Sequence, residues 1–345
     1  MPESGDENPD SRHYLSQPLV STIHTADPAA HLFDGRIYVY CSHDIDDGPP
    51  LPDVEPFKGS EGNKFKMRDY HVLSMDRIGG AVTIHPVALD INDVPWAARQ
   101  MWAPDAAFND GSYFLYFPAK DHAGAFRIGV ATSQNPAGPF TARPQPIEGS
   151  FSIDPAVFTD DDGKSFMYFG GINGGQLQMN VSGAYNPAAP KTVNLPPSSP
   201  ALMPKVAMMR PDMLEFAEPP RDVAIVDPAG NPLLNGDLNR RFFESARMHK
   251  YNGNYYFSYS TGDTHFIAYA IGHSPYGPFT HQGIILLPVQ GWTTHHSIVE
   301  AHGRSWLFYA DTQLSKKNWL RNVKVTELFY NPDGSIQVID PFVRA

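Results

Sequence analysis

Five segments of this chain repeat one layout: a polar residue, an apolar run, a turn that contains glycine, and a strand rich in aromatic residues. Residues 241–262 have it in its clearest form, because Asn252-Gly253 separates two strand-like runs. Asn-Gly between such runs is typical of a β-hairpin. Five diverged copies of one hairpin predict a repeat architecture. The hairpins open at Asp27, Asp105, Asp154, Glu244 and His296.

The spacing of these hairpins gives the size of the repeating unit. Successive openings are 78, 49, 90 and 52 residues apart, and the two long gaps contain insertions at 44–66 and 181–240. Without the insertions the unit is about 50 residues, which is the size of a propeller blade. A β-sandwich is the alternative, but it would not explain five similar hairpins. We therefore predict an all-β fold, a five-bladed β-propeller with four-stranded antiparallel blades around a central channel.

The predicted propeller occupies residues 18–345 as a single domain, and residues 1–17 form an N-terminal tail or a segment that closes the ring. The phrase Pro-x-Gly-Pro-Phe ends at Phe140 and again at Phe279, which indicates that the unit extends beyond its hairpin. Further strands are expected at 69–75 and 126–132. Residues 205–217 are the best candidate for a short helix.

Charge and cysteine content exclude several classes of protein. The formal net charge is −11, which disfavours nucleic acid and anionic membranes as partners. Cys41 is the single cysteine, so no internal disulfide forms. The N-terminus lacks a basic start followed by an apolar core, and no apolar run approaches a membrane span in length. We expect a cytoplasmic protein without nucleic-acid or membrane partners.

The residues that open the hairpins carry the candidate chemistry. The innermost strands of a propeller line its axis, so residues at the same place in each blade converge. Four carboxylates and an imidazole would share a small volume, where like charges raise one another's pKa. A protonated carboxyl beside an ionised one is the pair that glycoside hydrolysis requires. Taken singly, Asp27 and Asp154 precede proline, where aspartate often caps a turn, and Glu244 follows two phenylalanines, an apolar setting that suits an acid.

Two tryptophans lie close to the openings. Trp102 is three residues before Asp105, and Trp292 is four residues before His296. Flat apolar rings suit the faces of a pyranose, while carboxylates bind its hydroxyls. Packing between blades is the alternative for both rings. The sugar site is favoured for Trp102, and both interpretations stay open for Trp292.

The pair His295-His296 raises the question of a metal ion. Adjacent residues on a strand point to opposite faces, so only one of the two can face the axis. This arrangement does not suit a two-histidine transition-metal site. We expect a structural or electrostatic role for His296, with a hard cation such as calcium held through waters as an alternative in the oxygen-rich channel.

At this point the motifs resemble a known family, glycoside hydrolase family 43, whose members are five-bladed propellers acting on polymers that contain xylose and arabinose. The resemblance covers residues from about 18 to the end, and it is strongest to the single-domain β-xylosidases. The likeness to those β-xylosidases rests on residues 69–76, Asp69-Tyr70-His71-Val72-Leu73-Ser74-Met75-Asp76, and on residues 256–265. The motifs that carry it are Thr25-Ala26-Asp27-Pro28, Trp102-Ala103-Pro104-Asp105, Ser152-Ile153-Asp154-Pro155-Ala156, Phe243-Glu244-Ser245-Ala246 and Thr294-His295-His296-Ser297.

The resemblance implies a role for each matching residue. Asp27 is implied to be the general base, Glu244 the general acid, and Asp154 the residue that orients the acid and tunes its pKa. His296 is similar to an axial histidine near calcium, and Arg321 to an arginine that reaches the innermost sugar. The family inverts, so Asp27 and Glu244 should stand roughly 6.5–9.5 Å apart. Arg247 departs from the aromatic residue that the resemblance leads us to expect.

The leading hypothesis is an exo-acting inverting β-D-xylosidase that releases xylose from the ends of β-1,4-xylo-oligosaccharides and needs no cofactor for its chemistry. An α-L-arabinofuranosidase acting on arabinoxylan or arabinan oligosaccharides, or a bifunctional enzyme, is the alternative within the class. A catalytically inactive sugar-binding propeller is a second class, against which the intact acids argue. A protein-interaction propeller is a third, and it would show apolar patches instead of clustered acids.

Overall fold

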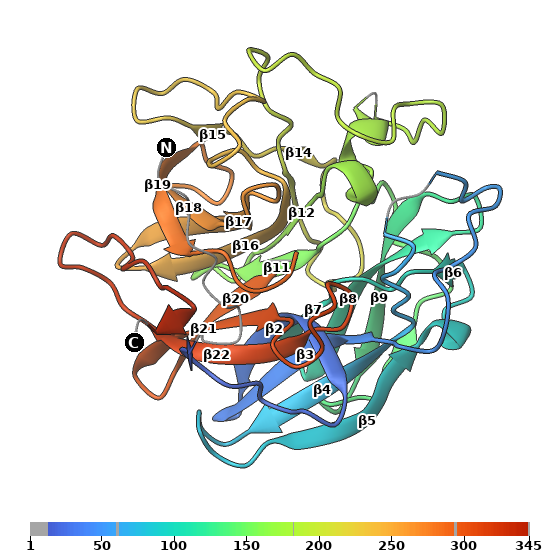
Figure 1. Cartoon of the computed structure of the whole chain (residues 1–345), viewed down its shortest axis with the longest axis horizontal. Helices are drawn as coiled ribbons and strands as arrows, with labels where there is room; N and C mark the ends of the chain where they lie inside the picture. Colours follow the sequence, from blue (N-terminus) through green and yellow to red (C-terminus); the bar gives the residue numbers. More distant parts are fainter. Residues whose placement is uncertain (1–12, 60–61, 182, 293–294, 344–345) are drawn as a thin grey trace, which may run out of the picture.

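Five sheets, antiparallel apart from one strand pair in the fourth blade, are arranged around one axis, so the all-β, five-bladed propeller is confirmed (Figure 1). The computed structural model describes residues 13–59, 62–181, 183–292 and 295–343. Helical structure in these residues is confined to three short 3-10 turns, and no helix among them is long and apolar enough to cross a membrane. These turns are η2 (Ile91–Asp93), η3 (Asn173–Gly175) and η4 (Leu177–Asn180).

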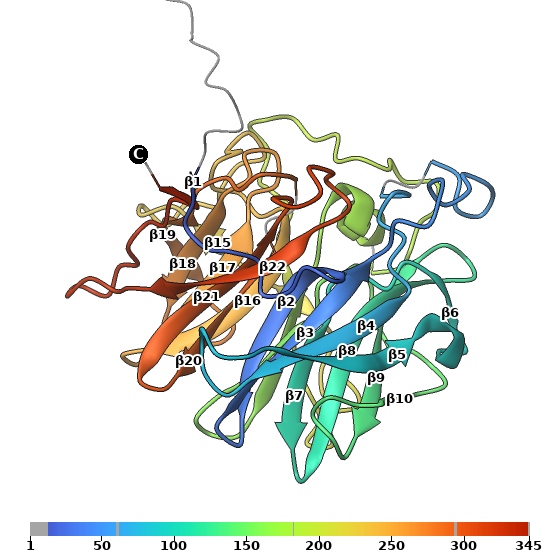
Figure 2. The ribbon, with the colours of Figure 1, turned by 60° about the horizontal axis from the view of Figure 1, so that its bottom comes forward.

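The first two blades are built from consecutive strands that lie side by side (Figure 2), and β2 and β7 are their inner strands. Strand β6 adds to the end of β8, beside the hairpin that β7 and β8 form. The first blade contains β2 (His24–Phe33), β3 (Arg36–Asp44), β4 (Asp69–Met75) and β5 (Thr83–Asp90). The second contains β6 (Ala97–Arg99), β7 (Asp105–Asn109), β8 (Ser112–Asp121), β9 (Phe126–Ser133) and β10 (Thr141–Ala142).

The third and fourth blades follow the same order, and the long insertion between them returns a strand to the fourth blade. Strand β15 comes from that insertion and pairs in parallel with β19. The third blade contains β11 (Ala156–Thr159), β12 (Ser165–Phe169), β13 (Lys205–Met208) and β14 (Arg221–Asp222). The fourth contains β15 (Ile225–Val226), β16 (Glu244–Tyr251), β17 (Asn254–Ser260), β18 (Ile267–Gly272) and β19 (Phe279–Leu286).

The fifth blade closes the ring against the N-terminal segment. It contains β20 (His296–Ala301), β21 (Arg304–Asp311) and β22 (Asn322–Leu328). The backbone N–H of Leu19 donates to the carbonyl of Val323 at 2.8 Å, so the chain start runs beside β22 before it enters the first blade. Strand β1 (His13–Tyr14) pairs with β23 (Phe342–Val343), which joins the two ends of the described chain.

The backbone geometry of the hairpin turns explains why the same dipeptides recur in the sequence repeat. Asn252 and Gly253 have φ of 48° and 79°, and Asp34 and Gly35 have φ of 50° and 77°. A two-residue turn with positive φ at both positions matches the twist of antiparallel strands, and it favours Asn or Asp followed by Gly. The turns predicted from these dipeptides are therefore confirmed.

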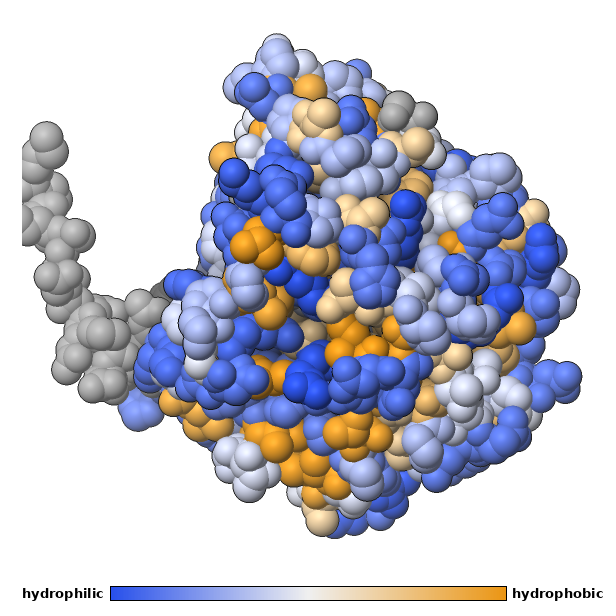
Figure 3. Space-filling model, turned by 90° about the vertical axis from the view of Figure 1, so that its right-hand side faces the viewer, coloured by the Kyte–Doolittle hydropathy of each residue, from blue (hydrophilic) through white to orange (hydrophobic). Residues whose placement is uncertain are grey.

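Aromatic residues of the returning strands form the core, which is divided among the five interfaces between blades. Each interface holds one cluster of buried residues, and Tyr40, Tyr70 and Phe117 exemplify the cluster between the first and second blades. Burying each such ring contributes about 1.5–3 kcal/mol relative to exposure. The side of the molecule in Figure 3 is mostly hydrophilic, with hydrophobic residues in smaller areas.

The prediction of a short helix at 205–217 is wrong. Residues Lys205–Met208 form β13, which pairs with β12 in antiparallel register. Val206 and Ala207 are completely buried between neighbouring strands. Tertiary pairing with β12 therefore overrides a local composition that suits a helix.

Candidate active site

The candidate catalytic residues lie at or near the start of the inner strands, where the backbone geometry is unusual. Asp27, Asp154 and Ser245 have φ of 52°, 60° and 63°. A residue other than glycine rarely adopts this region, and each instance costs about 1–3 kcal/mol. The ladder of β2 shifts register across Asp27, and that of β16 shifts directly after Glu244. A bulge of this kind re-aims side chains, and here it turns carboxylates toward the end of the axis.

One cavity of about 290 Å³ collects most of the predicted residues. The insertion at 44–66 supplies Gly62 and Phe65 to its wall, and the loop after the third hairpin supplies Asn173. The volume is close to the lower end of the range for small-ligand sites. The predicted residues that line it are Asp27, Trp102, Asp154, Glu244, Trp292 and Arg321.

Arg321 holds Asp27 in place. Its Nη1 lies 2.8 Å from Oδ1 of Asp27, and its Nε lies 2.8 Å from Oδ2 of Asp44. Ser42 also donates its hydroxyl hydrogen to Asp27. Burial raises the pKa of Asp27, but the guanidinium and the hydroxyl outweigh this effect, and the net pKa is lowered. Asp27 is therefore ionised at neutral pH.

Glu244 has the opposite surroundings. Its carboxyl is enclosed by protein and approached by Asp154, and side-chain ligand atoms of Asp154, Glu244 and His295 lie within 4.8 Å of one another. Burial first, and the negative charge of Asp154 second, raise the pKa of Glu244 to about 8. Glu244 therefore keeps its proton at neutral pH in the same cavity where Asp27 is ionised.

Asp154 contacts both His295 and the backbone of Ser245, the residue after Glu244. Its Oδ2 accepts a hydrogen bond from the backbone N–H of Ser245 at 2.9 Å and lies 3.2 Å from Nε2 of His295. Burial lowers the pKa of His295, but Asp154 and Asp27 outweigh this and raise it to about 9. Oδ1 of Asp154 has no hydrogen-bond partner among the described residues. This oxygen leaves an acceptor for the proton of Glu244.

Aromatic rings form the walls of the cavity. Trp102 donates its indole N–H to the carbonyl of Phe65 at 3.0 Å and packs at 4.9 Å against Phe126. Trp292 is 36% exposed, and its ring lies edge-on to Phe243 at 6.3 Å. Both tryptophans therefore have packing partners and a face that borders the cavity.

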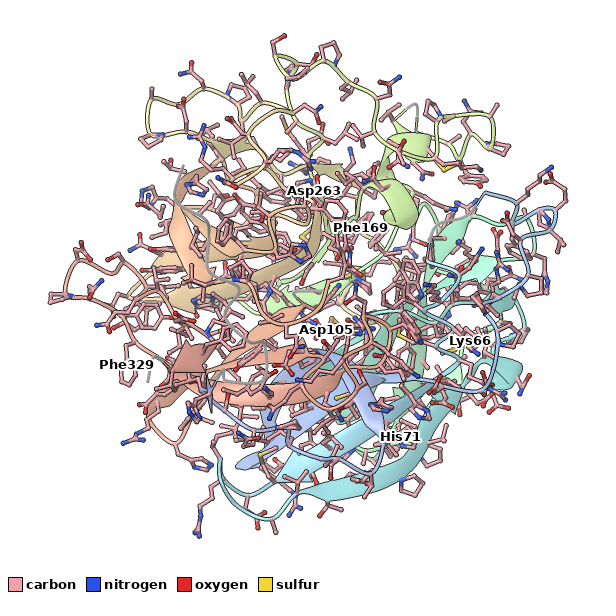
Figure 4. The ribbon with its side chains drawn as sticks, viewed as in Figure 1. Lys66, His71, Asp105, Phe169, Asp263 and Phe329 are labelled. Atoms are coloured by element: carbon pink, nitrogen blue, oxygen red, sulfur yellow. The ribbon has the colours of Figure 1, made fainter. Side chains whose placement is uncertain are left out.

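Asp105 is separated from the other acids. It lines a second cavity of about 390 Å³, and it lies near the middle of the ring (Figure 4). Arg247 lies 2.7 Å and His31 lies 2.8 Å from its Oδ1. Burial raises the pKa of Asp105, but these two partners lower it to about 2. The departure at Arg247 thus supplies the cation that neutralises this buried carboxylate.

His296 is fully buried, and its contacts do not form an oxygen cage. Its Nε2 lies 2.7 Å from the hydroxyl of Ser258, and its Nδ1 lies 3.4 Å from that of Ser245. Burial and the nearby Arg247 lower its pKa, so the ring is neutral. Calcium prefers six to eight oxygen ligands with several carboxylates. The calcium ion considered at His296 gains no support from these contacts.

Two residues of the site were not anticipated from the sequence. His295 lines the cavity, whereas the hairpin repeat was used to place His296 at the axis. Asp44 holds Arg321 from the side opposite Asp27. A buried arginine needs more than one acceptor, and this requirement is the sequence signal that could have led to Asp44.

Comparison with known proteins identifies the relatives of the chain. Residues 82–199 match the model of Glycosyl hydrolases family 43. Xylosidase/arabinosidase 43A of Humicola insolens is 54% identical over 331 residues, which cover 94% of this chain and 99% of that protein. A xylosidase/arabinosidase of Bacteroides ovatus is 51% identical over 325 residues, which cover 93% and 97%.

Two solved structures of GH43 enzymes are also similar to this chain. A GH43 β-xylosidase/α-arabinofuranosidase from a compost microbial metagenome, in complex with xylotriose and in a calcium-free form, has a TM-score of 0.92 and 59% identity. The match covers 96% of this chain and 99% of that one. A GH43_1 enzyme from Xanthomonas citri has a TM-score of 0.88 and 50% identity, covering 95% and 94%. The chain belongs to glycosyl hydrolase family 43.

Proposed function

We propose that this glycoside hydrolase is an inverting, exo-acting β-D-xylosidase that releases xylose from the ends of β-1,4-xylo-oligosaccharides. The observation that carries the proposal is one cavity with an ionised Asp27 and a protonated Glu244. The relatives named as xylosidase/arabinosidase and the neighbour solved with xylotriose support the substrate class.

In the proposed reaction Asp27 accepts a proton from a water molecule, whose oxygen attacks the anomeric carbon. Glu244 donates its proton to the glycosidic oxygen as the bond from that oxygen to the anomeric carbon breaks. The water oxygen ends on the face opposite the departing group, so the configuration inverts. Afterwards Asp27 carries a proton and Glu244 lacks one, and exchange with solvent restores both.

The remaining charged residues keep these two roles apart. Arg321 stabilises the ionised form of Asp27 through the ion pair at 2.8 Å. Asp154 accepts from the backbone N–H of Ser245, the residue after the acid, and its charge favours the protonated form of Glu244. We assign Asp154 to orientation and pKa tuning, as a positioning residue, and not to proton transfer.

The walls of the cavity support a substrate that enters by one end. Phe65, Trp102, Phe243 and Trp292 surround a volume of about 290 Å³, which suits a terminal sugar and its neighbour better than a long polymer. Aromatic faces pack on sugar rings while the acids bind hydroxyls. This arrangement favours removal of single terminal residues over internal cleavage.

An α-L-arabinofuranosidase activity of the same site is the second candidate. It is favoured by relatives whose names combine xylosidase and arabinosidase. The two activities would use the same acid and base and would differ in the sugar that the cavity accepts.

The test is product analysis by NMR with xylobiose, xylotriose and arabinoxylan oligosaccharides. We expect α-xylose as the first product from the β-linked substrate, released from one end. First formation of β-xylose would refute inversion, and release of arabinose alone would favour the second candidate. A purified, folded enzyme that cleaves neither aryl xyloside nor aryl arabinofuranoside would leave the sugar-binding propeller as the better hypothesis.

A further inference from the structure

Two histidines and an aspartate meet on the first blade, outside the catalytic cavity. In the ladder between β3 and β4, Cys41 pairs with His71 and Ser42 pairs with Tyr70, which places His43 opposite Asp69. Asp69 and His71 are two residues apart on β4, so their side chains point to the same face. The strand register alone therefore brings His43, Asp69 and His71 together.

The face of the sheet that carries this cluster is opposite to the face that contacts Asp27. Ser42 and Tyr70 alternate with the three residues along the two strands, and Ser42 donates to Asp27. Neighbouring residues on a strand point to opposite faces, so the cluster lies on the other side of the sheet. His71 lies on the first blade, outward from Asp105 at the middle of the ring (Figure 4).

The atoms of the cluster are arranged as metal ligands. Nδ1 of His43 lies 2.7 Å and Nε2 of His71 lies 3.9 Å from Oδ1 of Asp69. One potential ligand atom from each residue falls within 4.8 Å of the other two. The side chains of His43, Asp69 and His71 are 25%, 12% and 14% exposed, so an ion and a water ligand can reach them.

A backbone carbonyl sets the tautomer of His71. Nδ1 of His71 lies 3.1 Å from the carbonyl oxygen of His85. A carbonyl only accepts, so Nδ1 is the protonated nitrogen and Nε2 carries a lone pair in the neutral ring. Metal-binding histidines are oriented in this way, with the distal N–H held by a carbonyl or carboxylate.

We propose that His43, Asp69 and His71 bind a divalent transition-metal ion of the Zn²⁺ type on the face of β3 and β4 opposite Ser42 and Tyr70. Two imidazole nitrogens, one carboxylate oxygen and one water complete a tetrahedral set, which zinc prefers and calcium does not. When Zn²⁺ takes the place of the proton on Nδ1 of His43, that proton moves to Nε2 of the same ring, and the imidazole stays neutral. The ion links two strands of one blade and acts on stability, independently of the proposed reaction.

Calorimetric titration of the full chain with zinc chloride, after treatment with a chelator, tests this site. We expect one equivalent to bind and no comparable binding of calcium. His71→Gln and Asp69→Asn should each weaken binding at least tenfold. His122→Gln, at an exposed histidine elsewhere, is the matched control and should bind as the unmodified protein does.

The acids of the catalytic cavity are the competing zinc site, because Asp154, Glu244 and His295 also cluster. Glu244→Gln should therefore keep the binding, and loss of binding in that variant would overturn the proposal. So would unchanged binding in His71→Gln. If the β4 variants do not fold, Co²⁺ added to Glu244→Gln decides: visible bands of a four-coordinate, imidazole-bound ion support the site, and their absence refutes it.

Discussion

Replacing Asp154 with Asn should move the alkaline limit of activity to lower pH. In the proposed reaction Glu244 acts in its protonated form, so kcat/KM should be highest below its pKa of about 8 and should fall as the pH rises through that value. Asn has nearly the same shape as Asp and can still accept the hydrogen bond from the N–H of Ser245. The substitution thus removes a charge beside Glu244 and keeps the local backbone.

The size of this shift follows from the separation of the charges. Atoms of Asp154 and Glu244 lie within 4.8 Å, where two unit charges interact by about 3.5 kcal/mol at an effective dielectric constant of about 20. That energy corresponds to roughly 2.5 pKa units. His295 loses its partner in the variant, and the loss of its positive charge offsets part of the change. Burial of Glu244 is unchanged, so we expect a net shift of roughly 1–2 pH units.

The assay is the pH dependence of kcat/KM for an aryl β-xyloside, compared with Asp162→Asn as control. Asp162 lies at an exposed hairpin tip of the third blade, where it pairs with Lys164, so the control should leave the profile unchanged. An alkaline limit that stays in place or rises in Asp154→Asn would refute the electrostatic coupling. A lower rate with an unchanged profile would assign Asp154 to orientation alone.

Three further predictions test the proposed acid Glu244, the cavity wall at Trp292 and the buried amine of Lys120. Glu244→Gln should lower kcat on xylobiose by about 10²–10⁴-fold. It should have less effect on an aryl xyloside, whose phenol leaves without a proton. Equal losses of kcat on both substrates would contradict the role of Glu244 as acid. Trp292→Ala should raise KM with little change in melting temperature, because this ring is 36% exposed; an unchanged KM would remove it from the sugar site. Lys120 is buried without a hydrogen-bond partner among the described residues, and burial lowers its pKa to about 7. The unfolded state binds this proton more tightly, so Lys120→Met should raise the melting temperature more at pH 6 than at pH 9. A uniform or negative change in melting temperature would show that the amine is stabilised by other means.

The repeat made the architecture predictable because its signal is local. Each hairpin carries its own turn dipeptide and its own alternation of aromatic residues, as at Asn252-Gly253, where both residues adopt positive φ. Five copies of a local signal then require a closed arrangement, since every blade must cover its neighbour's aromatic face. No long-range information was needed beyond the count of units.

Positions around the axis were harder to predict, since equivalence in the repeat does not place side chains at equal depth. Asp27, Asp154 and Glu244 reach one cavity through a bulge or a positive φ at each strand opening. Asp105 opens the second hairpin, but its strand continues in regular register, and its carboxylate meets Arg247 in a different cavity. Backbone irregularities of this kind are set by tertiary contacts and leave little trace in composition.

The proposed acid and the proposed base are distinguished by a residue from another blade. Asp27 and Glu244 both open inner strands, and burial alone would raise the pKa of both. Arg321, from the loop before β22, reaches across the closure of the ring and pairs with Asp27 at 2.8 Å, and Asp44 holds it there. Without that guanidinium the pKa of Asp27 would rise toward that of Glu244, and the proposed base would be weakened as a separate ionised group. The closure between the first and fifth blades therefore does more than complete the fold, because it delivers the charge that separates the two proposed roles.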